Sequence, residues 1–407
     1  MADRGFADGI ALLGRRNVGR LFVAYLVTFA GTAMAPIGLA FGVLEMTGSA
    51  ADTGTVVMAQ PLAGVAILLL GGAIADRTSR KRVIVSAESL AMVAQLSIAT
   101  LLLTETATLP LLFLLMLLNG IAMAFNAPAS AGLIVQLVPR EELQPVNALL
   151  GIARNGAFAI GATLGGVLVA TVGAGWTLAI DGASFGISAL LIATLTPREQ
   201  RTSEGSSILE ELREGASEFF SHTWLWVIVA QFSLLVGVHE SVMGLIGPAV
   251  SRASLGGATS WGWIAGALGA GTLAGGLLSM RISPRHPMRV ATLLTFAFAT
   301  LPAALAVPLP VPLIALTAFV NGGAGSIFAV LWYTTLQRKI PEEMLSRVSA
   351  YDHLGSIVLA PIGIWAAGHL SDDIGASRTL WIGVTTVLTA SAVAFCVRDV
   401  RMMTNDV

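Results

Sequence analysis

Long apolar runs, separated by short polar or Gly/Pro-rich segments, dominate the hydropathy pattern of this chain. Each run is long enough for the ~20-residue helix that crosses a bilayer. The pattern predicts twelve spans in two sets of six, at residues 21–44, 53–75, 83–104, 109–133, 147–172, 176–196, 223–250, 258–280, 287–307, 311–336, 349–371 and 378–397. We therefore expect an all-α membrane protein whose twelve transmembrane helices form two six-helix bundles.

The two halves of the chain resemble each other, which favours pseudo-symmetric bundles. In one gapless alignment Asn119-Gly120 falls on Asn321-Gly322, and Gly173 falls on Gly375. Six-span repeats of this kind build transporters whose site lies between the halves, near the bilayer midplane. The predicted organisation is an N-terminal bundle, a cytoplasmic linker and a C-terminal bundle, at residues 1–197, 198–222 and 223–407.

The linker is the one long polar stretch between spans. Ser207 and Glu210 have the spacing of a capping box, which favours the start of a helix. The apolar residues that follow form one stripe at helical spacing, made of Ile208, Leu209, Leu212, Ala216, Phe219 and Phe220. Because the linker is net acidic, we expect this helix to pack on a bundle rather than on anionic headgroups.

Nearly all of the 23 lysine and arginine residues fall in the termini, the linker and the loops that twelve spans place on one side. The positive-inside rule then puts both termini in the cytoplasm. The first apolar run is too long for a cleaved signal peptide. Arginine outnumbers lysine 21 to 2, which together with the abundant alanine suggests a GC-rich bacterial genome. With the predicted spans, we therefore expect a multi-pass protein of a bacterial cytoplasmic (inner) membrane.

Composition excludes several classes of protein. The 407 residues are 55% apolar and 12% charged, whereas soluble chains are typically ~45–50% apolar and ~25% charged. No Gly-Lys pair exists, which excludes a Walker A loop. The single cysteine and the scattered histidines exclude thiolate clusters and metalloprotease motifs. We expect no enzyme activity, no cofactor, no metal and no nucleic-acid partner.

The loop between the second and third spans carries a motif. Residues 72–82 read Gly-Ala-Ile-Ala-Asp-Arg-Thr-Ser-Arg-Lys-Arg, which resembles the G-x-x-x-D-R-x-x-R-[RK] signature of the major facilitator superfamily. The resemblance implies a transporter that alternates between two orientations. It also implies a latch between the halves, made by Gly72, Asp76, Arg77 and Arg80, with Asp352 as the expected partner acid.

The fifth span carries a second motif. Its glycines, Gly156, Gly161, Gly165 and Gly166, resemble the antiporter motif of exporters in that superfamily, although Ala162 replaces the motif's proline. The alternative is a small-residue packing face, and the two interpretations stay open. The run at 137–149 resembles the branch of bacterial drug:proton antiporters and enterobactin-exporter-like proteins.

Charges inside the spans need an explanation, because each costs on the order of 3 kcal/mol at the centre of a bilayer. A carboxyl group in an apolar cavity can exchange protons near neutral pH. Glu240 is the first candidate for proton coupling, and the seventh span lines the cavity in the family that the motif resembles. The other coupling candidates are His239, Asp181 and Glu88. The alternative for each carboxyl group is a structural hydrogen bond or ion pair between helices.

Other polar or adaptable residues inside the spans are candidates for contact with a substrate. They are Thr32, Met34, Gln60, Asn119, Asn126, Arg154, Gln231 and Asn321. The alternative for each amide is a hydrogen bond between helices, worth ~0.6 kcal/mol.

These features predict a secondary active exporter that moves a small amphipathic or lipophilic molecule outward, coupled to proton entry. The alternatives are a dedicated siderophore or natural-product exporter, a lipid flippase and a non-transporting membrane sensor. The expected partners are a small-molecule substrate, protons and membrane lipids, and the expected state is a monomer.

Overall fold

The computed structural model describes residues 12–67, 79–139, 142–197, 208–307 and 309–404. These residues form helices and no strand, and eleven of the helical segments are long and apolar enough to cross a membrane. The predicted second span, 53–75, runs into residues 68–78, which lie outside the described residues. The all-helical membrane fold is therefore confirmed, and the twelfth span stays a prediction.

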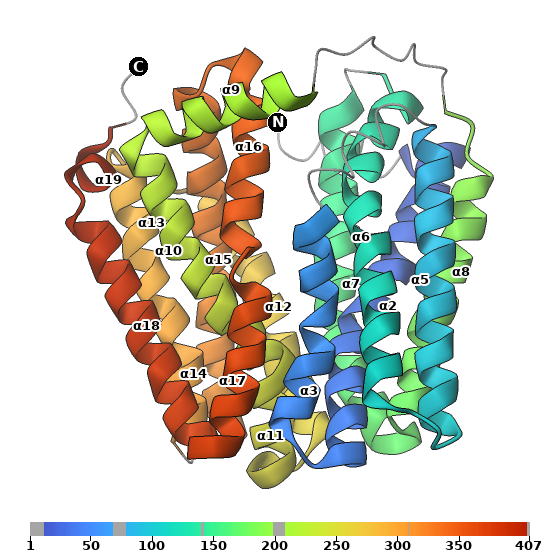
Figure 1. Cartoon of the computed structure of the whole chain (residues 1–407). Coiled ribbons are helices and arrows are strands. Elements are labelled where there is room, and N and C mark those ends of the chain that lie inside the picture. Colours follow the sequence, from blue (N-terminus) through green and yellow to red (C-terminus); the bar gives the residue numbers. More distant parts are fainter. Residues whose placement is uncertain (1–11, 68–78, 140–141, 198–207, 308, 405–407) are drawn as a thin grey trace.

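The helices group into two bundles (Figure 1). The first contains α2 (Arg16–Thr47), α3 (Ala50–Val57), α5 (Arg80–Leu103), α6 (Leu109–Leu137), α7 (Leu143–Val172) and α8 (Ala174–Ala193). The linker helix is α9 (Ile208–Ser221). The second bundle contains α10 (Thr223–Ser241), α11 (Gly247–Val250), α12 (Ala258–Ser279), α13 (Pro287–Thr295), α14 (Thr300–Ala306), α15 (Val311–Lys339), α16 (Glu342–Ile357), α17 (Ala360–Ile374), α18 (Ala376–Cys396) and α19 (Arg398–Met402). Below, these two bundles are called the N-half and the C-half.

The backbone repeats at one pair of aligned glycines. Gly173 joins α7 to α8 with φ 90° and ψ 168°, and Gly375 joins α17 to α18 with φ 90° and ψ 150°. A residue with a Cβ is strained at such a φ, so both turns require glycine. The same turn at aligned positions supports the internal repeat.

Among the described residues, the two halves share a hydrophobic core at one end of the molecule. Figure 1 shows α3 and α11 at one end, here called the α3 end, and α9 and α19 at the other, the α9 end. Towards the α3 end, Ile37 and Phe41 of the N-half pack in one cluster with Trp261 and Ile364 of the C-half. In the described residues, the clusters towards the α9 end each belong to one half alone. The described parts of the two halves thus share a core at the α3 end and have separate cores at the α9 end.

Polar contacts reinforce the closure at the α3 end. Asp372 at the end of α17 accepts hydrogen bonds from Ser49 Oγ at 2.7 Å and from the Ala50 and Ala51 amides at 3.0 Å each. Those amides open α3, where the helix dipole favours a negative charge. Arg252 Nη1 donates to the carbonyl oxygen of Leu44 at 2.7 Å, also from the C-half to the N-half.

The linker helix α9 packs on the C-half. Glu214 forms an ion pair with Arg347 of α16, and buried Phe219 lies 6.0 Å from Tyr351, centroid to centroid. Phe220 is 66% exposed, so its expected place in the packed stripe is wrong. Neighbouring residues on a helix point about 100° apart, and Phe219 takes the packed position. The side chains of Ile208, Leu209 and Leu212 lie outside the described part.

Candidate functional site

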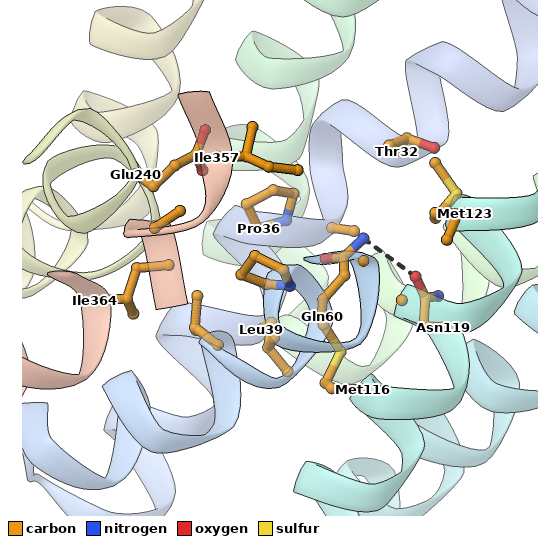
Figure 2. Close-up of a pocket in the computed structure, with 18 of the residues that line it drawn as sticks. Thr32, Pro36, Leu39, Gln60, Met116, Asn119, Met123, Glu240, Ile357 and Ile364 are labelled. Atoms are coloured by element: carbon orange, nitrogen blue, oxygen red, sulfur yellow. Dashed lines mark hydrogen bonds between the residues drawn. The ribbon is translucent and has the colours of Figure 1, made fainter. Parts of the chain in front are cut away.

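A cavity of about 380 Å³ lies between the two halves. The N-half lines it with α2, α6, α8 and the helical residues 59–67, and the C-half with α10, α16 and α17 (Figure 2). Most of the lining is apolar, including Pro36, Leu39, Met116, Met123, Phe185 and Ile364. No lysine or arginine is among the residues that line it. The cavity therefore suits an apolar ligand body and has little to attract several negative charges.

Glu240 faces this cavity and His239 does not. Glu240 is exposed and lies close to Ile357 in Figure 2, on the side of the cavity that the C-half forms. His239 lines a small void within the C-half, where its ring lies 6.3 Å from that of Phe298. Adjacent residues on α10 point in different directions, so the structure presents one of the two to the cavity.

Asp181 reaches the cavity from the N-half. It lies on α8, is 1% exposed, and its Oδ1 has no hydrogen-bond partner among the described residues. A Cβ added at Gly31 of α2 would lie 2.7 Å from that oxygen, so the glycine makes room for the carboxyl group. A buried, unpaired carboxylate is costly unless a proton or a ligand balances it.

Amide side chains form a short row on the N-half wall. Gln60 Nε2 donates to Asn119 Oδ1 at 3.2 Å, and Asn119 Nδ2 donates to Gln95 Oε1 at 3.4 Å (Figure 2 shows the first). Gln60 and Asn119 were expected at the cavity, and both line it together with Thr32. Their bonds to each other hold the wall in place and fix which amide atoms remain for a ligand.

A second, more polar pocket of about 550 Å³ lies within the N-half. Here Glu88, 3% exposed, accepts hydrogen bonds from Asn126 Nδ2 at 2.8 Å and Thr28 Oγ1 at 3.4 Å. Arg154 also lines this side pocket. Three residues line both spaces, namely Thr32, Met123 and Phe185. The side pocket and the cavity therefore meet.

Three of the expected substrate contacts lie away from the cavity. Gln231 is buried in the C-half and donates to Thr295 Oγ1 at 2.8 Å and Ser391 Oγ at 3.2 Å. Asn321 is buried beside Phe298, and Met34 is buried against Gly165 within the N-half. These side chains stabilise their own bundles and do not reach a ligand in the cavity.

We predict that Gln231→Leu destabilises the protein without changing its transport activity. The change removes two hydrogen bonds from a buried network, which costs about 1–2 kcal/mol in total. Thermal unfolding of the purified protein should show a melting temperature lower by a few degrees, with transport intact in the folded fraction. Gln60→Leu is the matched comparison, since Gln60 lines the cavity, and it should alter transport. Loss of transport in Gln231→Leu alone would contradict this prediction.

Three residues of the expected latch, Gly72, Asp76 and Arg77, lie outside the described residues. Arg80 opens α5, and its guanidinium group lies over Gly132 of α6. Asp352 is 5% exposed and accepts a hydrogen bond from Trp332 Nε1 at 3.0 Å. In this conformation Asp352 is therefore engaged inside the C-half, and the latch stays a prediction for another state.

The motif glycines of α7 have different surroundings. A Cβ at Gly161 or Gly165 would lie 2.9 Å from the Cα of Ala30 or Met34 of α2, whereas a Cβ at Gly166 would lie 2.6 Å from the Cα of Gly262 in the C-half. Gly156 has open space around it. The helix continues through the position where the motif has proline, since α7 spans Leu143–Val172. Close packing is what Gly161, Gly165 and Gly166 provide here.

Sequence reasoning missed several residues at the site. His353 and Phe185 line the cavity, and Gln95 holds Asn119. Phe185 follows Asp181 at helical i+4 spacing, which places the two on one face. That spacing was a signal for Phe185, but nothing comparable marks His353.

Known proteins resemble this chain over most of its length. "Multidrug efflux pump Tap" of Mycolicibacterium fortuitum is 26% identical over 378 residues, covering 88% of this chain and 90% of that protein. "Enterobactin exporter EntS" of Escherichia coli O1:K1 / APEC is 25% identical over 385 residues, covering 92% and 88%.

Solved structures share the fold. The crystal structure of a bacterial homolog to the human lysosomal transporter Spinster, in an inward-facing and unoccupied conformation, has a TM-score of 0.74 at 16% identity and covers 93% of this chain and 95% of that one. The D-xylose-proton symporter has a TM-score of 0.71 at 15% identity and covers 98% and 100%. The family model described as Major Facilitator Superfamily matches residues 21–355. With that match across its helices, the chain belongs to the major facilitator superfamily of transporters.

Proposed function

We propose that this transporter is a secondary active exporter of a small amphipathic molecule, which it moves by alternating access against proton entry. The observation that carries the proposal is the cavity between the halves. It is mostly apolar, it has a carboxyl group from each half in Glu240 and Asp181, and no lysine or arginine is among the described residues that line it. Such a site can hold an apolar ligand and exchange protons in the same space.

Charge and closure support an orientation in which the closed α3 end faces away from the cytoplasm. The halves are joined at the α3 end and have separate cores at the α9 end. Arg20 and Lys81 lie at the α9 end, where they donate to Thr194 and Leu195 carbonyl oxygens just beyond the end of α8. By the positive-inside rule this end faces the cytoplasm. A ligand would then enter from the cytoplasm and leave after the α3 end opens.

The relatives support export and leave two substrate classes. Similarity to a multidrug efflux pump favours a broad range of lipophilic molecules as substrates, and the apolar lining of the cavity is consistent with such substrates. Similarity to an enterobactin exporter favours a dedicated natural-product exporter as the second candidate. At 100 mV one proton supplies ~2.3 kcal/mol, enough for a gradient of roughly 50-fold.

We predict that Glu240→Gln abolishes substrate-dependent proton flux while leaving the fold intact. Glutamine keeps the size of the side chain but cannot bind and release a proton. The measurement is proton movement in proteoliposomes with an imposed pH gradient, after addition of lipophilic cations, macrolides or siderophores. At least a tenfold loss of flux is expected.

Glu45→Gln is the control, because Glu45 is an exposed acid near the α3 end and does not line the cavity. It should behave like wild type. If substrate-dependent proton flux survives in Glu240→Gln, the proton-coupling residue is Asp181 or Glu88 instead. If wild type gives no flux with any compound, the coupled-exporter proposal fails, and lipid flipping and ligand binding without flux become the functions to assay.

A further inference from the structure

Arg154 is a cation at membrane depth that the fold alone does not explain. It is the twelfth residue of α7 and lies seven residues into the predicted span 147–172, so at 1.5 Å per residue it is roughly 10 Å along the helix from the start of that span. An arginine at such depth is unfavourable unless it faces water, a cavity or a partner. Arg154 is exposed, and it lines the side pocket of the N-half.

No described protein group pairs with this arginine. Among the described residues, Arg154 has no hydrogen-bond or ion-pair partner, whereas Arg20 and Arg252 each donate to a backbone carbonyl oxygen at 3.2 and 2.7 Å. The acid of the same pocket, Glu88, takes its hydrogen bonds from Asn126 and Thr28 instead. The guanidinium group therefore keeps its donors free.

Neutral donors share the side pocket with the guanidinium group. Tyr25 of α2 and Asn147 of α7 line the side pocket together with Arg154. Phenol and amide groups donate hydrogen bonds without adding charge. One guanidinium fork with neutral donors matches a singly charged oxyanion.

We infer that the side pocket binds the anionic group of the transported amphiphile, with Arg154 as its counter-ion. The ligand is a molecule with one carboxylate or sulfonate group on an apolar body. The body reaches the central cavity where Thr32, Met123 and Phe185 line both spaces. The anion and the proton-binding Glu240 are then in separate compartments. The inference rests on the proposed function in taking this ligand as the exported molecule.

Ligand binding tests this without any flux measurement. The probes are dansylglycine, which carries one carboxylate, and dansylamide, its neutral analogue, added to purified protein in a phosphate-free maltoside detergent and followed by dansyl fluorescence. Wild type should prefer the anion. Arg154→Gln should weaken dansylglycine binding roughly 10- to 100-fold, as expected for charged hydrogen bonds, and leave dansylamide binding unchanged. Arg154→Lys should restore part of the affinity, because it keeps the charge without the fork.

Arg82→Gln is the matched control, since Arg82 is an exposed arginine at the start of α5 and does not line the side pocket. It should bind both probes as wild type does. Equal wild-type affinity for the two probes, no binding of either, or equal losses for both in Arg154→Gln would overturn the inference.

A lipid phosphate is the other source of an anion. If phosphatidylglycerol added to the detergent displaces dansylglycine from wild type at equimolar amounts, the site belongs to lipid and the assignment to the exported molecule fails. If dansylglycine persists, the assignment stands. Because these readouts are equilibrium binding, loss of proton coupling in the flux assay would refute the proposed function without changing their outcome.

Discussion

Gly166→Ala is expected to shift the transporter towards the state in which the α3 end is open. The new methyl group would lie 2.6 Å from Gly262 Cα and would also meet the Ala258 carbonyl oxygen, both on α12 of the C-half. Backbone atoms cannot move aside as a flexible side chain can, so overpacking costs about 1–3 kcal/mol. Only the state in which the halves meet bears that cost. The ratio of the two states should therefore change roughly 5- to 150-fold.

Labelling of one cysteine measures this shift. The cavity residue Ile364 is 1% exposed, so Ile364→Cys, in a chain that also carries Cys396→Ser, should react slowly with an impermeant maleimide added from the α3 side. Gly166→Ala should accelerate the reaction.

Two neighbouring glycines of α7 are internal controls. Gly156→Ala meets no atom within 4 Å and should change nothing. Gly161→Ala meets Ala30 within the N-half, so it should lower the melting temperature without changing the labelling rate. If Gly166→Ala behaves like Gly161→Ala, the α7–α12 contact does not control access.

The fold could be predicted from the sequence because a bilayer leaves few choices. Apolar runs of span length must be helices, since backbone polar groups in lipid must bond within the segment. The glycines that the sequence aligned, Gly173 and Gly375, also form two turns with the same φ. Which end is closed could not be predicted, because it depends on contacts such as Asp372 with α3, made by residues far apart in the chain.

The site could be predicted only in part. The sequence shows which polar residues lie inside a span, but whether such a side chain points into the cavity depends on how the neighbouring helices pack. Glu240 and His239 show this, because both lie on α10 and only the first lines the cavity. Gln231 is similar in kind to Gln60, yet its partners Thr295 and Ser391 hold it inside the C-half. Periodicity alone cannot distinguish a cavity face from an interface between helices.

Asp372→Ala is expected to open the α3 end by a second, independent route. Asp372 makes three hydrogen bonds to the start of α3, and charged acceptors contribute about 1.5–3 kcal/mol per bond when buried. Asp372 is exposed, so screening by water reduces the total to about 1–2 kcal/mol. The population of the open state should rise roughly 5- to 30-fold. The same labelling of Ile364→Cys should report it.

Asp373→Ala is the control for Asp372→Ala, because Asp373 is an exposed acid one residue further along α17 and makes no hydrogen bond among the described residues. It removes the same charge, so an equal shift in both variants would mean that charge alone, and not the bonds to α3, holds the end closed.

Gly166→Ala acts between α7 and α12, whereas Asp372→Ala acts between α3 and α17. Distant, independent contacts contribute additively, so the double variant should show the product of the two shifts. A double variant no more open than either single variant would mean that breaking one contact already releases the other, so that the α3 end opens as one cooperative unit.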